Sequence, residues 1–221
     1  MKRTLPFLVF LALAACAPGS RAQTPPDPEG RLDNAALPPI GFGTLSQNDV
    51  SVLLRDDEVE LRFLPLDERV IRLLAPDAYQ ALSALVRQSQ PAIDSIASSR
   101  GLSSPGLALV TFYGRVARAR FDPQLVSLQV RGHPIFPLGM VPIGPGFSNR
   151  ELGVRGQARA IFVFEEIVPV IEPFTLSYGT QQSAAWESRI QLLARERGRA
   201  VRRAQAADTT GSGEQGAGSG S

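Results

Sequence analysis

The residue types that most often perform catalysis are sparse in this 221-residue chain. His133 is the only histidine, and it precedes Pro134 in a segment with the composition of a turn. A histidine acts as a general base when a nucleophile and an orienting carboxylate lie beside it. The chain has no Gly-x-Ser-x-Gly motif, which would mark the nucleophile of an α/β-hydrolase. We therefore predict no catalytic residues and interpret His133 as a surface residue.

Carboxylates gather in two places, and neither has the pattern of a site. Residues 56–60 contain four acids but lack the glycine and the spaced oxygen ligands of a calcium loop. Glu165 and Glu166 are adjacent at the end of a predicted strand, where neighbours point to opposite faces and would not share a proton. One histidine and one cysteine provide too few ligands for a transition-metal site. The sequence thus predicts neither a metal nor a cofactor.

The charge of the chain gives no argument for a nucleic-acid partner. The formal net charge is +2, from 23 basic and 21 acidic side chains. Removal of residues 1–15 would take away Lys2 and Arg3 and leave a neutral chain. A basic footprint is what nucleic-acid binding requires, so we predict no nucleic-acid partner.

The first sixteen residues, MKRTLPFLVFLALAAC, have a positive start and a short apolar run. The run ends in Leu13-Ala14-Ala15-Cys16, which resembles the lipobox of bacterial lipoproteins. The resemblance implies that Cys16, the only cysteine, is lipidated and becomes the mature N-terminus. It also implies an extracytoplasmic, membrane-anchored protein, with the outer membrane favoured because no Asp follows the cysteine. A plain secretory signal cleaved after Ala22 and a retained anchor are the alternatives.

The domain organisation follows from composition. We predict a signal peptide over 1–15, then the lipidated cysteine and a flexible tether over 16–48, which is rich in Pro, Gly and Ser. A single β-rich domain is expected over 49–205, and a disordered Gly/Ser tail over 206–221.

Within the domain, alternating apolar residues predict an antiparallel β-fold. A hairpin is expected over 49–64, with Asp56-Asp57 at its turn. Helical spacing predicts a small helical insertion over about 76–99, which we expect Pro91 to break into two helices. Further strands are expected at 107–113, 117–121, 125–131, 135–141, 158–165 and 174–178.

Residues 107–178 also resemble a known kind of domain. The resemblance rests on three features: Phe121-Asp122-Pro123 before a Leu-Val-Ser-Leu strand, an Arg-Gly turn, and the aromatic strand 161–164 after a Gly-Gln pair. This order resembles the immunoglobulin-like domain of small bacterial lipoproteins of unassigned function. The resemblance implies an immunoglobulin-like β-sandwich and gives no catalytic residues.

The C-terminal segment, about 185–205, is predicted to be an amphipathic helix. Trp186, Ile190 and Leu193 share one face, and the segment carries six arginines and two glutamates. In one interpretation the apolar face docks on the β-domain and the arginines are solvated. In the other, arginines contact anionic lipid or an acidic partner. The residues expected to make that contact are Arg195, Arg199, Arg202 and Arg203.

These observations favour a non-enzymatic envelope lipoprotein that binds or scaffolds another envelope component. Its expected partners are the membrane, through the lipid anchor, and an envelope protein. The alternative is a periplasmic carrier that holds an apolar ligand in a cavity of the sandwich. A hydrolase is the third and least favoured function. A binding role predicts an exposed apolar patch, whereas a carrier predicts a closed cavity of several hundred Å³, roughly the size of known ligand sites.

Overall fold

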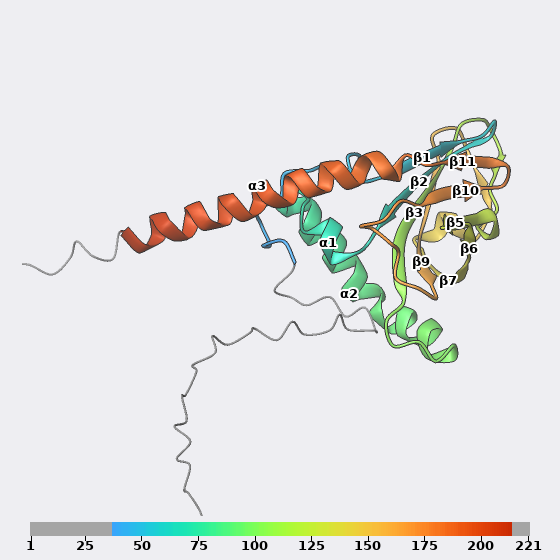
Figure 1. Cartoon of the computed structure of the whole chain (residues 1–221). Helices are drawn as coiled ribbons and strands as arrows, with labels where there is room; N and C mark the ends of the chain where they lie inside the picture. The colour runs from blue at the N-terminus through green and yellow to red at the C-terminus, as the bar shows by residue number, and fades with distance from the viewer. Residues whose placement is uncertain (1–36, 214–221) are drawn as a thin grey trace, which may run out of the picture. The chain divides into compact units, whose positions relative to one another are not determined.

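The computed structural model describes residues 37–213, with side chains described as far as Thr209. The predicted signal peptide, Cys16, residues 17–36 of the predicted tether and residues 214–221 of the predicted tail lie outside the described residues. The described part is mainly antiparallel β-structure, with a C-terminal helix and a helical insertion (Figure 1). The predicted mainly β fold class is therefore confirmed at this level.

The larger sheet has five antiparallel strands in the order β1-β2-β3-β9-β7. Its strands are β1 (Val52–Arg55), β2 (Val59–Pro65), β3 (Gly106–Gly114), β9 (Gln157–Phe164) and β7 (Pro137–Ile143). The predicted hairpin is confirmed, because β1 pairs with β2 across a short turn. Asp56 fixes that turn by accepting hydrogen bonds from the backbone N–H groups of Glu58 and Val59.

The second sheet has four antiparallel strands in the order β11-β10-β5-β6. Its strands are β11 (Gln181–Ser183), β10 (Thr175–Tyr178), β5 (Val126–Val130) and β6 (His133–Ile135). The single strand predicted over 135–141 is wrong, because β6 pairs with β5 and β7 pairs with β9 in the other sheet. Pro137 cannot donate a ladder hydrogen bond, and the register shifts beside it, so the chain changes sheets at Phe136.

A third, two-stranded sheet joins β4 (Ala119–Arg120) to β8 (Glu151–Leu152). Two 3₁₀ turns, η2 (Pro123–Leu125) and η3 (Pro145–Phe147), lie in the connections. Each begins with proline, whose fixed φ suits the first position of a helical turn.

Aromatic rings from the two larger sheets form one core. Phe112 of β3 stacks on Phe121 at 4.6 Å between ring centroids and lies 5.7 Å from Tyr178 of β10. Phe63 of β2 meets Phe174 edge-on at 5.9 Å. Phe162 of β9 is fully buried. Ring pairs at these distances add stabilisation beyond the area they bury.

The helical insertion is one helix, α2 (Pro76–Ser99), so the expected break at Pro91 is wrong. Ile93 is buried and Ile96 is half-buried, on the side of α2 that contacts β7. Pro91 is exposed, and so is Arg87, whose carbonyl group Pro91 leaves without a donor, so water can solvate that carbonyl.

The domain begins earlier than the sequence analysis places it. Leu45, inside the predicted tether, is buried and forms a parallel bridge with Leu74. The N–H of Leu45 donates to the carbonyl oxygen of Leu73 at 3.0 Å, just after the short helix α1 (Glu68–Ile71). A tether reaching residue 48 is therefore wrong for its last residues. We call residues 42–45 the N-terminal strap.

The C-terminal helix, α3 (Trp186–Gly213), is longer than predicted. Residues 206–213 belong to this helix and not to a disordered tail. Ala204, Ala206 and Ala207 have high helix propensity and favour this continuation of α3. Within residues 37–213, no helix combines the length and the apolar character needed to cross a membrane.

Candidate contact surface on the C-terminal helix

The first turns of α3 dock on the β-structure through Trp186. This side chain is fully buried and stacks on Phe174, with ring centroids 5.1 Å apart. Its Nε1 donates to the carbonyl oxygen of Val170 at 3.2 Å, which satisfies the indole N–H. Leu193 is buried and Ile190 packs partly against the core. The structure thus supports the docked interpretation for the apolar face of α3.

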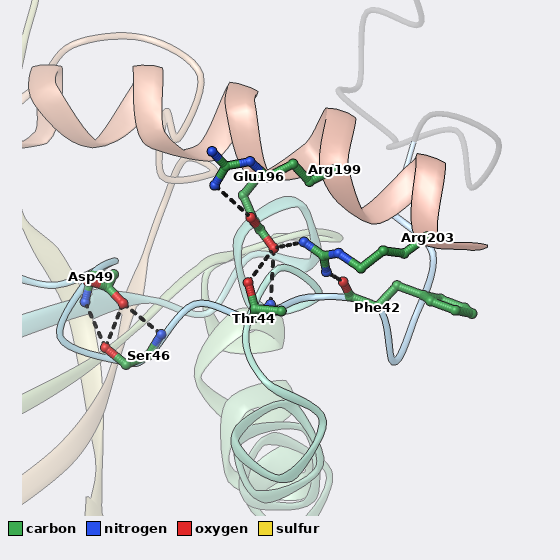
Figure 2. Close-up of polar contacts among 7 residues, drawn as sticks. All are labelled: Phe42, Thr44, Ser46, Asp49, Glu196, Arg199 and Arg203. Atoms are coloured by element: carbon green, nitrogen blue, oxygen red, sulfur yellow. Dashed lines mark hydrogen bonds and ion pairs between the residues drawn. The ribbon is translucent and has the colours of Figure 1, made fainter. Parts of the chain in front are cut away.

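The four arginines expected to contact a membrane or partner divide into two groups. Arg195 and Arg202 are exposed, and neither forms an ion pair with a residue in the described part of the chain. Arg199 has a side chain that is 60% exposed, and its Nη1 lies 3.8 Å from Glu196. Arg203 binds another residue of the same chain, because its Nη2 donates to Glu196 Oε1 at 2.6 Å (Figure 2). Three of the four therefore remain available to another molecule.

Glu196 joins α3 to the N-terminal strap. Its side chain is only 1% exposed, and its Oε1 accepts hydrogen bonds from the Thr44 hydroxyl at 2.8 Å and the Thr44 N–H at 3.1 Å. Arg203 Nη2 donates to the same oxygen at 2.6 Å. We call Thr44, Glu196 and Arg203 the Glu196 clamp (Figure 2).

The clamp keeps Glu196 ionised. Burial disfavours the charged carboxylate, but the hydrogen bonds from Arg203 and Thr44 outweigh it, so the pKa of Glu196 is lowered. Arg203 also donates to the carbonyl oxygen of Phe42. One arginine thus neutralises the buried carboxylate and holds the strap.

A second polar contact follows the strap. The Ser46 hydroxyl and N–H donate to Asp49 Oδ2 at 2.7 and 2.8 Å. These two bonds lower the pKa of Asp49, and the positive charge of Arg189 on α3 acts in the same direction. Asp49 therefore lies close enough to Arg189 of α3 for their charges to interact.

An open apolar groove lies between α1, the start of α3 and the segment before β10. Its volume is about 290 Å³. We call it the Ile171 groove; it is lined by Arg69, Val70, Leu73, Val170, Ile171, Ile190, Leu193, Ala194 and Arg197. Ile171 is 63% exposed, so the groove presents a large aliphatic side chain to the surface. Arg69 and Arg197 also line the groove, and Arg69 is paired with Asp67, because its Nε and Nη2 donate to Oδ1 and Oδ2 at 2.9 and 2.6 Å.

A larger depression, about 610 Å³, lies beside Tyr178 and has several charged residues in its lining. Its carboxylates hold the surrounding turns: Glu58 accepts from the N–H of Arg120 at 2.8 Å, and Asp122 accepts from the N–H of Gln124 at 3.0 Å. Tyr178 accepts from the N–H of Asp122, and burial raises the pKa of its hydroxyl. This arrangement fixes loops and contains no paired nucleophile and base.

The single histidine and the two adjacent glutamates lie at the surface. His133 is exposed at the start of β6, and Glu165 and Glu166 are exposed after β9. Within residues 37–213, no group of three or more His, Cys, Asp or Glu side chains is placed to hold a metal ion. Cys16 lies outside the described residues.

Sequence reasoning missed the Glu196 clamp because it treated the charges of the helix only as an excess of arginine over glutamate. A signal was present: Glu196 lies three residues after Leu193 and four before Ala200, both of which are buried. Residues at this spacing share one helix face.

Comparison of the chain with protein-family models, with curated proteins and with solved structures gave no match.

Proposed function

We propose that this chain is an extracytoplasmic lipoprotein without enzymatic activity, whose domain binds another envelope component. The lipobox-like Leu13-Ala14-Ala15-Cys16 supports a lipid anchor at Cys16. The proposed partners are the membrane, through that anchor, and an envelope protein that the domain contacts. The outer membrane is the proposed location, because no Asp follows Cys16.

The observation that carries the binding role is the Ile171 groove. It offers an exposed apolar residue and open apolar walls. Arginines are enriched at protein interfaces, and an apolar centre with a polar rim is the usual anatomy of a contact site. The charge of α3 selects the partner: residues 186–205 carry six arginines and two glutamates. The occupant we propose is a protein segment with an apolar side chain flanked by carboxylates.

The carrier alternative has less support. A ligand inside the β-structure needs space between the sheets, but the rings of Phe112, Phe121 and Phe162 occupy that space. The Ile171 groove is open and smaller than the cavities that enclose most of a ligand, which have about 300–1,000 Å³. A hydrolase remains the third function, with no supporting geometry among the described residues.

We also infer that residues 107–178 form a variant of the immunoglobulin-like sandwich. Two antiparallel sheets that share an aromatic core support this assignment. The variant departs from the pattern because β1 and β2, which precede this region, extend the larger sheet. The change of sheet between β6 and β7 is a second departure.

The binding role is tested by site-specific photocrosslinking of the full-length protein in its native envelope. A photoreactive amino acid replaces Ile171 in one variant and Val154 in the control. Val154 is similarly exposed, at 60%, but lies outside the groove. We expect one discrete adduct from position 171 and none from position 154. Mass spectrometry should place the crosslink on a partner segment that contains carboxylates beside an apolar residue.

Two further results test whether the Ile171 groove binds an acidic protein segment. Charge reversal of the exposed Arg195 and Arg202 should weaken the adduct if the partner is acidic. Equal adduct patterns from positions 171 and 154, or a crosslink only to lipid, would contradict a protein-binding groove.

A further inference from the structure

A separate polar site lies on the face of the five-stranded sheet that points away from the aromatic core. Phe112 is in the core, so Thr111 and Tyr113, its neighbours on β3, point to the opposite face. The strand register places Arg62 of β2 and Arg159 of β9 directly across from Thr111, one on each side. Two guanidinium groups therefore flank one hydroxyl group on three consecutive strands.

One donor of this site lacks an acceptor within the described part of the chain. The Nε of Arg62 is buried and has no hydrogen-bond partner there. Thr111 beside it is only 4% exposed. A buried donor without an acceptor costs about 1–3 kcal/mol, so such a group marks a place where a ligand or water is expected.

The local charge is positive and uncompensated. The small cavity between these residues is lined without any Asp or Glu. The nearest acid on this face of β2 is Glu60, and its carboxylate is bound to Arg55 Nε at 2.5 Å. The guanidinium of Arg62 lies over the Tyr113 ring, 5.4 Å from its centroid, which holds the arginine in place.

The size of the cavity limits the ligand. Its volume is about 80 Å³. A water molecule takes up about 30 Å³ in the liquid, so the space fits a small polyatomic anion and excludes a peptide or an organic cofactor. Gln47 and Gln157 complete the lining and can donate through their side-chain amides.

We infer that Arg62, Thr111 and Arg159 bind a phosphate group, either as free phosphate or as the headgroup of a lipid. A carboxylate has two oxygens in one plane, which a single arginine can engage completely. A tetrahedral phosphate presents oxygens to both arginines and a further one to the hydroxyl between them. This site differs in residues and in chemistry from the Ile171 groove, and it does not depend on the proposed function.

The test measures binding to the full chain purified in an uncharged detergent. Isothermal titration calorimetry at fixed ionic strength compares inorganic phosphate, the soluble lipid dihexanoyl phosphatidic acid, and acetate. The variants are Arg62→Gln and Arg159→Gln, and the control is Arg87→Gln, which removes the same charge from an exposed position on α2. Arg159 is exposed, so its variant should fold normally. Each site variant should raise the Kd for the phosphate ligand about tenfold or more, and the control should not change it.

The three ligands separate the outcomes. Binding of inorganic phosphate supports the site and identifies free phosphate as a sufficient ligand. Binding of the phosphatidic acid alone supports the site and identifies the lipid headgroup as the source. Absence of binding by both, equal binding of acetate, or equal losses in the Arg87→Gln control would overturn the inference.

Discussion

Glu196 accepts two hydrogen bonds from Thr44, although the two residues lie 152 positions apart in the chain. The bonds connect the strap that precedes β1 to the helix that follows β11. Because the carboxylate is almost fully buried, the contact depends on Glu196 being ionised and on Arg203 being present. The clamp is therefore a stability element that responds to pH.

Replacing Glu196 with Gln should lower the free energy of unfolding at pH 7 by about 1–3 kcal/mol, the usual worth of hydrogen bonds to a charged group. The folded pKa is below the ordinary value of 4.5, so the stabilisation is complete well above 4.5 and is lost as the pH falls through the folded pKa. Denaturant titrations between pH 3 and pH 7, roughly the span of carboxyl titration, measure the difference.

The control for this prediction is Glu187→Gln, at an exposed position on the same helix. The difference in free energy of unfolding between the native protein and Glu196→Gln should become smaller as the pH falls. The free energy of unfolding of the control should follow that of the native protein at every pH. If this difference in free energy of unfolding stays constant from neutral to acidic pH, ionisation of Glu196 does not stabilise the fold.

The strap should also be sensitive to a single methyl group. A Cβ at Gly43 would lie 2.2 Å from the carbonyl carbon and 2.4 Å from the carbonyl oxygen of Leu73. Backbone atoms cannot move aside easily. Gly43→Ala should therefore lower the free energy of unfolding by about 1–3 kcal/mol and increase proteolysis within the strap. Gly153→Ala, where a Cβ meets open space, is the matched control. Equal stability and equal protease resistance of the two variants would contradict close packing of the strap on Leu73.

Sequence alone predicted much of the β-structure. The strands β3 and β9 were expected because each contains an apolar run, 107–110 and 160–164, and no proline. The division of β6 from β7 could not be predicted, since it depends on which sheet each half pairs with. Pro91 misled the prediction because its effect depends on exposure, which the sequence does not state. These errors arise where tertiary packing decides the local structure.

The candidate site was predicted only in part. The arginine excess led to the expectation that Arg195 and Arg202 make an outside contact, and both side chains are exposed. It could not separate them from Arg203, because the partner of Arg203 is a buried residue next to a distant strap. The Arg62 and Arg159 site was missed entirely, since its two arginines come together only through the register of three strands.

The proposed anchor predicts a simple fractionation result. Cys16→Ser should release the protein from the membrane fraction and abolish incorporation of labelled fatty acid, because a lipid chain supplies the binding energy. Immunoblotting of membrane and soluble fractions, together with autoradiography, measures both effects. A variant that stays with the membrane, beside a native protein without label, would rule out lipidation at Cys16.

The arginine face of α3 gives a prediction about membranes. If it contacts anionic lipid beside the anchor, changing Arg195, Arg199 and Arg202 to Gln should weaken binding to anionic vesicles at least tenfold, because each arginine near such a surface contributes about 1 kcal/mol. Sedimentation of a non-lipidated variant beginning at Thr24 with anionic and neutral vesicles measures this. Arg203 is left intact because it belongs to the clamp.

A control with the same loss of charge is Arg87, Arg100 and Arg131 changed to Gln, all at exposed positions outside α3. Equal loss of vesicle binding in the two triple variants would indicate a general charge effect. If the protein binds anionic and neutral vesicles equally, the membrane interpretation is contradicted, and an acidic protein remains the expected partner of these arginines.

The position of the strap has a mechanical consequence. Any pull on the chain from the side of Cys16 reaches Phe42, Thr44 and Leu45 before it reaches β1. The load is then shared by the bonds to Arg203 and Glu196 on α3 and by the bridge from Leu45 to Leu74. These contacts must rupture before the edge strand β1 begins to peel from β2. A protein held to a moving surface by its N-terminal side would therefore keep its β-sheets unloaded until the strap detaches.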